Sequence, residues 1–363
     1  MKNIIFITSC LSFGGAEKML SFVAESFAKR QHNVTIINLK RIQNNSDYER
    51  IVPGVSIETI SKPTNNTFKI LYYIKHIRKI AKTKNADCII GFTMLPNFYA
   101  SVVGKLLQIP SIISERGNPY RTITESFKDR IVMYFINRAN GGVFQTNGAK
   151  AFYSKGLQER GKVIPNPIFI PEELQGISWN EHNKTVVYVG RLDNCQKRLD
   201  ILLKSFALFH SNHTEYRLRL FGKGADERLI EQWCNELGIR ENVDFMGLAK
   251  QPMKEIVKDG IFIITSDFEG ISNSLLEAMA VGLPCVSTDH EPGGARLLIT
   301  DHENGLLAPV GDIKALAKAL EEFADNDALA RKCGNNARNV VNRFAPIKII
   351  DMWDSYIENV CRS

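Results

Sequence analysis

The sequence has few features of a secreted, metal-binding or membrane-spanning protein. Its seven cysteines are scattered singly and form no C-x-x-C pair, which argues against a disulfide framework and structural zinc and favours reduced, cytosolic thiols. The histidines show no metal-ligand spacing, and no apolar run approaches the roughly 20 residues that a membrane span needs. The short, polar-interrupted apolar run at the start predicts a buried strand rather than a signal peptide. We therefore expect a protein that is soluble, or peripheral at most.

The net charge of +7 conceals an asymmetry between the two halves. Residues 1–168 hold 24 Lys and Arg against 10 Asp and Glu, a net charge of +14, whereas residues 169–363 hold 22 against 29, a net charge of −7. A basic half suits an anionic partner such as a membrane surface, a pyrophosphate-bearing substrate or a nucleic acid. The chain has no helix-turn-helix, zinc or RNA-binding signature, so we expect no nucleic-acid partner.

Short apolar runs alternate with helical patterns in both halves of the chain. The predicted strands are Asn3–Thr8, Val34–Leu39, Cys88–Thr93, Ser111–Ser114, Gly142–Gln145, Thr185–Val189, Arg217–Phe221, Val243–Met246, Ile261–Thr265 and Pro284–Ser287. The predicted helices between them include Ala16–Arg30, Phe68–Thr83, Phe98–Leu107, Asp200–Phe209 and Asp226–Leu237. Such alternation predicts parallel sheets covered on both faces. The expected fold is therefore α/β, with two doubly wound, Rossmann-like domains facing a cleft.

A proline-rich segment separates the two halves. Pro165 and Pro167 fix φ and bias their neighbours toward extended backbone, which suits an interdomain hinge. We expect domains at 1–166 and 167–344, with a C-terminal helix at about 345–363 packing back on the first domain. The tail Asn336–Val360 reads as a helix that is interrupted near Pro346.

The segment Asp267–Asp289 is the most informative part of the chain. Glu269 follows a predicted strand, and Glu277 lies eight positions later inside the next predicted helix. Between them lies a helix start made of small and polar residues, Gly270, Ser272, Asn273 and Ser274. A helix start attracts anions, because its first N–H groups lack helical partners and the helix dipole adds positive charge. Two carboxylates around an anion site suit a ligand with a central diphosphate and hydroxyl groups at both ends, such as a nucleotide sugar.

Two cations follow the first predicted strand of the second half. Arg191 and Lys197 lie beyond Gly190, where ligands of open α/β sheets bind. They are either solvated loop cations or a pair that neutralises a diphosphate. The Glu269–Glu277 segment in the same domain favours the second alternative.

Several short motifs occur in a fixed order along the chain. They are Gly14-Gly15-Ala16-Glu17, Gly190-Arg191-Leu192, Lys197-Arg198-Leu199-Asp200, Phe268-Glu269-Gly270-Ile271-Ser272-Asn273, Leu276-Glu277-Ala278-Met279-Ala280, Gly282-Leu283-Pro284, and Glu303-Asn304-Gly305-Leu306-Leu307 with Pro309 and Gly311-Asp312. In this combination they resemble glycosyltransferase family 4, with matches that span residues 6 to 312. The resemblance implies the GT-B fold and a retaining, metal-independent sugar transfer with no cofactor.

The resemblance also implies roles for individual residues. The implied catalytic residues are Arg191 and Lys197, which hold the diphosphate as the glycosidic bond breaks, and Glu269, which contacts the transferred sugar. Glu277 is expected to bind the ribose hydroxyls. The other expected donor-binding residues are Gly14, Gly15, Leu248, Gly270, Ile271, Ser272, Asn273, Ser274 and Leu275. Lys197 lies one position further from Arg191 than is usual in the family, which predicts a slight bulge. No second carboxylate is placed for a glycosidase-like dyad, so the resemblance favours front-face attack.

Glu115 and Arg116 leave two alternatives open. Related enzymes often have His where this chain has Arg116, so no histidine base is assigned. The two side chains either contact the acceptor or form a buried structural ion pair. Ser114-Glu115-Arg116, Ile164–Pro167 and the N-terminal pattern look most like bacterial enzymes that build capsule, O-antigen or lipid-linked oligosaccharides.

The segment Phe68–Lys84 combines an apolar face with many cations. The predicted face consists of Ile70, Ile74, Ile77 and Ala81. The cations are Lys69, Lys75, Arg78, Lys79, Lys82 and Lys84. The segment is either a surface helix packed on the sheet or one whose basic side also touches anionic lipid.

The favoured hypothesis is a hexosyltransferase that acts on surface glycans. It would move a hexose or N-acetylhexosamine from a nucleotide sugar, with UDP preferred over GDP-mannose, to a polyprenyl-diphosphate-linked glycan. We expect it to be cytoplasmic and peripheral on the inner face of the plasma membrane. The alternatives are another GT-B enzyme, such as a UDP-sugar epimerase or a phosphorylase, or a GDP-mannose-dependent mannosyltransferase. Asp325-Asn326-Asp327 matches the D-x-D metal pattern, but its place between predicted helices favours a solvated turn.

Overall fold

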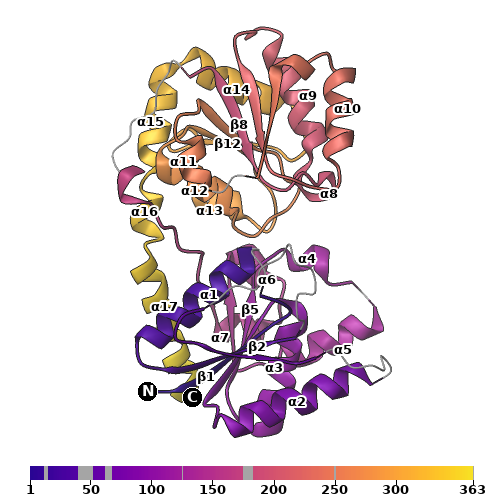
Figure 1. Ribbon diagram of the computed structural model, residues 1–363, viewed down its shortest axis with the longest axis vertical. Coiled ribbons are helices and arrows are strands. Elements are labelled where there is room, and N and C mark those ends of the chain that lie inside the picture. The colour runs from indigo at the N-terminus through magenta and orange to yellow at the C-terminus, as the bar shows by residue number, and fades with distance from the viewer. Residues whose placement is uncertain are drawn as a thin grey trace. The chain divides into compact units, whose positions relative to one another are not determined.

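The computed structural model divides the chain into two compact units, Met1–Asn166 with Ile347–Ser363, and Pro167–Pro346. It describes residues 1–11, 15–39, 52–61, 68–124, 126–174, 183–248 and 251–362. Figure 1 labels the helices and strands of both units. Strands and helices alternate in each, because an apolar strand in a parallel sheet needs a helix layer on both faces to be shielded from water.

Within the described residues, the N-terminal unit contains a seven-stranded sheet in the order β3-β2-β1-β4-β5-β6-β7. All neighbouring strands are parallel. The strands are β1 (Asn3–Thr8), β2 (Asn33–Asn38), β3 (Ser56–Thr59), β4 (Cys88–Phe92), β5 (Ser111–Glu115), β6 (Gly141–Phe144) and β7 (Gly161–Val163). The order reverses between β1 and β4, as in a Rossmann fold.

Helices cover both faces of this sheet. They are α1 (Gly15–Lys29), α2 (Lys69–Thr83), α3 (Met94–Leu107), α4 (Pro119–Thr122), α5 (Phe127–Ile136), α6 (Asn147–Ala151), α7 (Lys155–Arg160) and α17 (Pro346–Arg362). Alternate strand residues such as Ile5 and Ile113 join one core with side chains of α2, α3 and α5. On the other face, Phe6 meets Phe27 of α1 with ring centroids 6.5 Å apart. This alternation is the period of two that a strand imposes on its side chains.

The C-terminal helix α17 is part of the N-terminal unit, beside which Figure 1 shows it in yellow. Trp353 of α17 stacks on Phe92 of β4, with ring centroids 5.9 Å apart. Tyr356 accepts a hydrogen bond from the backbone N–H of Gly142 at 2.7 Å. A side chain at Gly141 would place its Cβ 2.5 Å from the Tyr356 hydroxyl, so the helix packs closely only because this strand residue is glycine.

The C-terminal unit repeats the Rossmann order with a six-stranded parallel sheet in its described part, β10-β9-β8-β11-β12-β13. Its strands are β8 (Thr185–Val189), β9 (Arg217–Phe221), β10 (Val243–Gly247), β11 (Ile261–Ile264), β12 (Cys285–Thr288) and β13 (Leu306–Ala308). Its helices are α8 (Asn194–Lys197), α9 (Leu199–His210), α10 (Glu227–Glu236), α11 (Pro252–Ile256), α12 (Asn273–Val281), α13 (Gly294–Leu298), α14 (Ile313–Asp325), α15 (Asp327–Ala337) and α16 (Val340–Arg343), with 3₁₀ turns at Glu172–Leu174 and Arg240–Asn242. The predicted pair of doubly wound Rossmann-like domains is confirmed.

Several elements differ from the predictions. Three short strands, β3, β7 and β13, were not predicted, and α3 begins at Met94 rather than Phe98 because Pro96 is tolerated in a first helical turn. The tail contains α15, α16 and α17, so the breaks fall near residues 338–339 and 344–345. The apolar face of α2 is also shifted, since Tyr73, Ile77 and Ala81 are buried while Ile70 is exposed.

Candidate functional site

The carboxyl edge of the C-terminal sheet brings Lys197 and Glu269 together. Lys197 ends α8 in the loop after β8, and Glu269 lies in the loop after β11. The strands β8 and β11 are neighbours, so their carboxyl ends share one edge of the sheet. The Lys197 Nζ donates a hydrogen bond to the Glu269 Oε1, and both residues are less than 10% exposed. The sequence placed both residues at a ligand site, and the structure shows that they contact each other.

Glu269 is held by more than one donor. The Ser266 hydroxyl also donates to the Glu269 Oε1, at 2.6 Å. Burial alone would raise the pKa of Glu269, but the charge of Lys197, the nearby His290 and the two hydrogen bonds together lower it. The carboxylate is therefore ionised at neutral pH although it is buried.

A single helical turn, α8, carries Lys197 to this position. Asp193 accepts a hydrogen bond from the Cys195 N–H at 3.0 Å and caps α8, while Arg198 closes it with a left-handed φ of 50°. The Thr265 hydroxyl donates to the carbonyl of Lys197 at 3.0 Å, and the Asp267 N–H donates to the carbonyl of Gln196 at 3.0 Å. The predicted bulge is thus an ordered turn joined to the loop after β11.

Arg191 behaves differently from Lys197. Its side chain is 67% exposed, and it donates to the Gln196 Oε1 at 2.9 Å. Its guanidinium lies 3.6 Å from a carboxylate oxygen of Asp193. An exposed, weakly tethered arginine is able to move toward an anion at this edge without leaving a buried charge behind.

The helix α12 begins beside Glu269 and contains Glu277. Ser272 is the N-cap, and its hydroxyl accepts a hydrogen bond from the Leu275 N–H at 3.5 Å. Ser274 lies in the first turn, with its hydroxyl 3.2 Å from that of Ser272. Glu277 is buried one turn further on. The first turn of α12 supplies the anion-attracting helix start that the sequence predicted next to Glu269.

The loop after β12 is a part of the site that sequence reasoning missed. Phe268 and Glu291 form an isolated parallel bridge, and the Glu269 N–H donates to the Glu291 carbonyl at 3.2 Å. A Cβ at Gly294 would lie 1.6 Å from the carbonyl oxygen of Gly270, so only glycine permits this approach. The signal that was available is the Pro292-Gly293-Gly294 run, which follows a predicted strand.

The remaining predicted donor-site residues are Leu248 in the C-terminal unit and Gly14 and Gly15 in the N-terminal half of the chain. Leu248 follows β10 and is 67% exposed. Gly15 is the first residue of α1, directly beyond β1, whereas Gly14 lies outside the described residues. Their contacts with a donor stay predictions.

The contacts of Glu115 and Arg116 lie within the N-terminal unit. Glu115 Oε1 accepts hydrogen bonds from the N–H groups of Arg116 and Gly117 at 2.9 Å, and its Oε2 accepts one from the Tyr153 hydroxyl at 2.7 Å. Among the described residues, Glu115 therefore binds the backbone N–H of Arg116 rather than forming the buried side-chain ion pair that was one of the two alternatives. Contact of either residue with an acceptor stays a prediction.

The Arg116 side chain is enclosed. Its Nε donates to the Ser114 hydroxyl at 2.8 Å and its Nη1 to the Ile164 carbonyl at 3.3 Å. The guanidinium carbon lies 5.4 Å from the Phe92 ring centre and 5.3 Å from that of Trp353. Burial lowers the pKa of Arg116 to about 9, against the opposing charge of Glu115. The side chain therefore ties the end of β5 to α17 and to the segment before the hinge.

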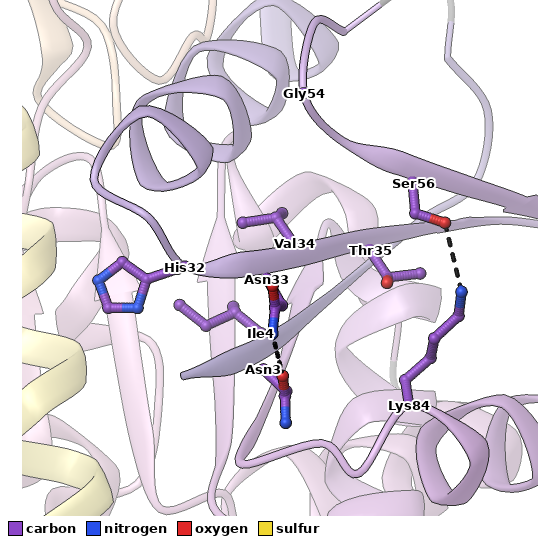
Figure 2. A pocket seen from close by; sticks show the side chains of 9 residues that line it. All are labelled: Asn3, Ile4, His32, Asn33, Val34, Thr35, Gly54, Ser56 and Lys84. Carbon is purple, nitrogen blue, oxygen red and sulfur yellow. Dashed lines mark hydrogen bonds between the residues drawn. The ribbon is translucent and has the colours of Figure 1, made fainter. Parts of the chain in front are cut away.

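Figure 2 shows a pocket in the N-terminal unit at the amino ends of β1, β2 and β3. Asn3, Asn33 and Ser56 begin these strands, and dashed lines mark the bonds from Asn33 to Asn3 at 2.8 Å and from Lys84 to Ser56 at 3.4 Å. The strands are parallel, so this pocket lies at the edge opposite the one where ligands of open α/β sheets bind. None of the predicted site residues lines it.

Possible metal ligands do not gather in the structure. Among the described residues, no group of three or more His, Cys, Asp or Glu side chains is placed to hold a metal ion. Asp325 ends α14, Asn326 accepts a hydrogen bond from the Leu329 N–H at 3.0 Å, and Asp327 begins α15. The D-x-D segment is therefore a capped turn between helices, as predicted.

Family models match both halves of the chain. The model of "Glycosyl transferases group 1" matches residues 169–340, which contain Lys197 and Glu269, and that of "Glycosyltransferase Family 4" matches residues 13–170. Both halves of the chain are therefore glycosyltransferase domains, and the chain is a glycosyltransferase. The predicted resemblance and the predicted class of enzyme are confirmed.

Two curated relatives of this glycosyltransferase come from Campylobacter jejuni. One is named GalNAc-alpha-(1->4)-GalNAc-alpha-(1->3)-diNAcBac-PP-undecaprenol alpha-1,4-N-acetyl-D-galactosaminyltransferase, and is 28% identical over 99% of both chains. The other is named N-acetylgalactosamine-N,N'-diacetylbacillosaminyl-diphospho-undecaprenol 4-alpha-N-acetylgalactosaminyltransferase. It is 25% identical over 95% of this chain and 96% of its own.

Solved glycosyltransferase structures share the fold. The HepE protein of Anabaena in complex with UDP superposes with a TM-score of 0.83 at 18% identity, covering 99% of this chain and 100% of that one. The lipopolysaccharide outer core galactosyltransferase WaaB superposes with a TM-score of 0.81 at 20% identity, covering 99% of each chain. At these identities the likeness establishes the GT-B fold.

In the part of the chain that the structure describes, no helix is both long enough and apolar enough to cross a bilayer.

Proposed function

We propose that this glycosyltransferase transfers a hexose or N-acetylhexosamine from a UDP-linked sugar to a polyprenyl-diphosphate-linked surface glycan, with retention of configuration. The observation that carries the proposal is the buried contact between Lys197 and Glu269 at the carboxyl edge of the C-terminal sheet. A cation for the diphosphate and a carboxylate for the sugar lie side by side there, next to the helix start that suits an anion.

The chemistry of the donor explains why both charges are needed. As the glycosidic bond breaks, negative charge grows on the diphosphate, and a fixed cation stabilises that charge more in the transition state than in the ground state. Lys197 would supply this cation, with the exposed Arg191 as a second one. Glu269 would accept hydrogen bonds from sugar hydroxyls, and Glu277 from the ribose. The preference for a UDP-linked donor over a GDP-linked one rests on the family resemblance.

Retention is proposed to follow front-face attack. The acceptor hydroxyl attacks the anomeric carbon from the side of the leaving diphosphate, which takes up the hydroxyl proton. Lys197 and Arg191 then stabilise the diphosphate without a metal ion or cofactor. The anomeric configuration of the product, read from its NMR coupling constants, tests retention, and transfer in the presence of EDTA tests the independence from metal.

The acceptor is proposed from the relatives and from surface chemistry. Both Campylobacter relatives are named for undecaprenyl-diphosphate-linked acceptors. An acceptor of this kind would be met at the cytosolic face of the plasma membrane, which carries negative charge. The excess of cations in residues 1–168 is complementary to such a surface.

The helix α5 offers the surface best suited to that contact. Phe127, Ile131 and Tyr134 recur at helical spacing, and all are exposed, Phe127 by 78%. The cations Lys128 and Arg130 of α5 are exposed too, as is Arg138 just after the helix, whose guanidinium lies over the Tyr134 ring. We call these six side chains the α5 face. Amphipathic surfaces of this composition bind at lipid interfaces. The α2 helix adds exposed Phe68, Ile70 and Leu71 beside its own cations.

The decisive experiment is a screen of nucleotide sugars followed by a transfer assay. Thermal shift with UDP-GalNAc, UDP-GlcNAc, UDP-galactose and GDP-mannose identifies the donor, and a lipid-diphosphate acceptor then tests transfer. Transfer from a UDP-sugar to the lipid-linked acceptor is the expected result. Conversion of a UDP-sugar in the absence of acceptor would instead favour the epimerase alternative, and selective use of GDP-mannose would favour a mannosyltransferase.

A further inference from the structure

His290 is a buried titratable residue at the site for which sequence reasoning gave no role. It lies in the loop after β12 and is fully buried. Neither of its ring nitrogens forms a hydrogen bond within the described residues. A buried polar group without a hydrogen bond loses its hydration without compensation, so a side chain of this kind calls for a functional explanation.

The fold joins the loop of His290 to the loop of Glu269, and the charge of Glu269 acts on the imidazole. The loop that carries it is fixed to the loop of Glu269 by the bond from the Glu269 N–H to the Glu291 carbonyl, at 3.2 Å. The Thr288 hydroxyl adds a bond to the Ser266 carbonyl at 2.7 Å. Lys197 reaches Glu269 from the loop after β8, so Glu269 lies among residues of three loops.

Several neighbours act on the pKa of His290. Burial lowers it, the charge of Glu269 raises it, the charge of Lys197 lowers it, and the Glu291 backbone and the charge of Asp289 raise it. The net shift is downward, so the imidazole is neutral at pH 7 while Lys197 is in place. A neutral imidazole keeps one N–H donor and one acceptor nitrogen.

In the proposed reaction, two anionic groups compete for the Lys197 ammonium group. In the structure it pairs with Glu269, whereas a bound diphosphate would compete for the same ammonium group. If Lys197 turned to the diphosphate, the Ser266 hydroxyl would remain as the side-chain donor to Glu269 among the described residues. A buried carboxylate that loses its cation is strongly destabilised, because its lost hydration is no longer compensated.

We infer that His290 is a positioning residue that becomes the partner of the Glu269 carboxylate when the donor diphosphate draws Lys197 away. The imidazole takes up a proton from solvent at one ring nitrogen and donates an N–H to Glu269, so Glu269 stays ionised and directed at the sugar. The role assigned to the donor rests on the proposed function, while the pairing of His290 with Glu269 is a property of the protein alone.

The first test needs no donor. In Lys197→Met, which removes the competing cation, the pKa of His290 measured by ¹⁵N NMR should rise by about one unit or more above that of the wild type. In Lys197→Met/Glu269→Gln it should fall back. An unchanged His290 pKa in Lys197→Met would overturn the inference. If that variant does not fold, Glu269→Gln alone decides, since the pKa of His290 should then fall below the wild-type value.

The second test uses the reaction and a matched control. His290→Phe keeps a planar ring without a donor, and should lower kcat on the order of 100-fold through a misplaced Glu269, with UDP affinity unchanged. His290→Gln should recover part of the loss, because its amide donates to a carboxylate. His210→Phe is the control, because His210 in α9 also has a buried ring nitrogen without a hydrogen bond and stacks on Phe206 at 5.4 Å. It should leave kcat unchanged.

The outcomes separate the two proposals. If the wild type transfers sugar and His290→Phe does so equally well, the inference about His290 fails and the proposed function stands. If the wild type neither binds nor transfers any nucleotide sugar, the proposed function fails, and the NMR titration still decides whether His290 pairs with Glu269.

Discussion

The N-terminal and C-terminal units arrange their parallel strands in the same Rossmann order, but their charged side chains differ in burial. The C-terminal unit buries Lys197 and Glu269 in contact at the carboxyl edge of its sheet. The N-terminal unit belongs to the basic half and displays cations among apolar side chains on the α5 face. Buried charges are little screened by salt, so they suit a small bound ligand, whereas exposed cations suit an extended anionic surface.

The N-terminal unit also has a buried charge, and its surroundings are different. The Arg116 guanidinium lies between the Phe92 and Trp353 rings and donates to Ser114 and Ile164. Ser114 and Phe92 lie at the carboxyl ends of β5 and β4. Ile164 and Trp353 lie close to the two points where the chain passes from one unit to the other. The same fold therefore has one buried cation at the proposed ligand site and another that holds parts of its own chain together, and mutations can separate the two roles.

The largest expected effect is the loss of transfer in Lys197→Ala. Removing a preorganised cation that stabilises the leaving diphosphate should lower kcat on the order of 1000-fold, while the fold persists. Glu269→Ala should have a comparable effect. Steady-state kinetics with the donor found in the screen measure kcat, and circular dichroism checks the fold.

The matched control for Lys197 is Lys204→Ala. Lys204 is an exposed lysine of α9 in the same unit, and its removal should leave kcat within about twofold, because an exposed charge contributes little. Wild-type turnover in Lys197→Ala or Glu269→Ala would contradict the catalytic assignment.

An intermediate effect, on stability rather than on chemistry, is expected for Arg116→Met. The change leaves the Ser114 hydroxyl and the Ile164 carbonyl without a donor and should lower the free energy of unfolding by about 2–4 kcal/mol. Urea denaturation followed by tryptophan fluorescence measures it, because Trp353 lies against this side chain.

Arg130→Met is the control for Arg116. Arg130 is exposed on α5, so its loss should change the free energy of unfolding by less than about 0.5 kcal/mol. If Arg116→Met instead keeps wild-type stability and selectively raises the KM for the acceptor, Arg116 contacts the acceptor and the structural interpretation is wrong.

The smallest expected effect concerns the α5 face. Phe127→Ser and Ile131→Ser together should weaken binding to vesicles that contain anionic lipid by roughly tenfold, because each removes exposed apolar area that would enter the interface. Flotation at low and high salt measures the binding, which should also weaken as salt is added.

The comparison between the units supplies the control for this experiment. Leu229 is an exposed apolar residue of α10 in the C-terminal unit, and Leu229→Ser should leave vesicle binding unchanged. If the α5 variant and Leu229→Ser weakened vesicle binding equally, or if binding did not respond to salt, no charged surface of the N-terminal unit would direct the contact.

Most strands with largely buried side chains could be predicted, although the short buried strand β13 was not. Asn3–Thr8, Thr185–Val189 and Arg217–Phe221 have the predicted bounds, because each combines β-rich, apolar character with nearby turn signals. The strand β3 was not predicted, because most of its residues are exposed and its sequence is polar. It is a strand because it pairs with β2, with Thr35 opposite Ser56, and no local pattern reveals such a partner.

The candidate site likewise contains residues that could be predicted from the sequence and residues that could not. Lys197 and Glu269 could be singled out because each follows a strand within a recognisable motif. His290 could not, because nothing near it in the sequence marks it as buried next to a carboxylate. Trp353 likewise gave no sign that it would cover Arg116, which precedes it by more than half the length of the chain.

The sequence by itself determined the two Rossmann-like units, the family and the motifs that carry the predicted donor site. These depend on local periodicity and on residue types at fixed spacing, which can be read along the chain. The tertiary structure alone decided which of those residues are buried and what they contact, such as Lys197 with Glu269 across 72 positions of sequence. The physical reason is that desolvation and charge pairing act through space, so the state of an ionisable side chain depends on neighbours that folding brings together.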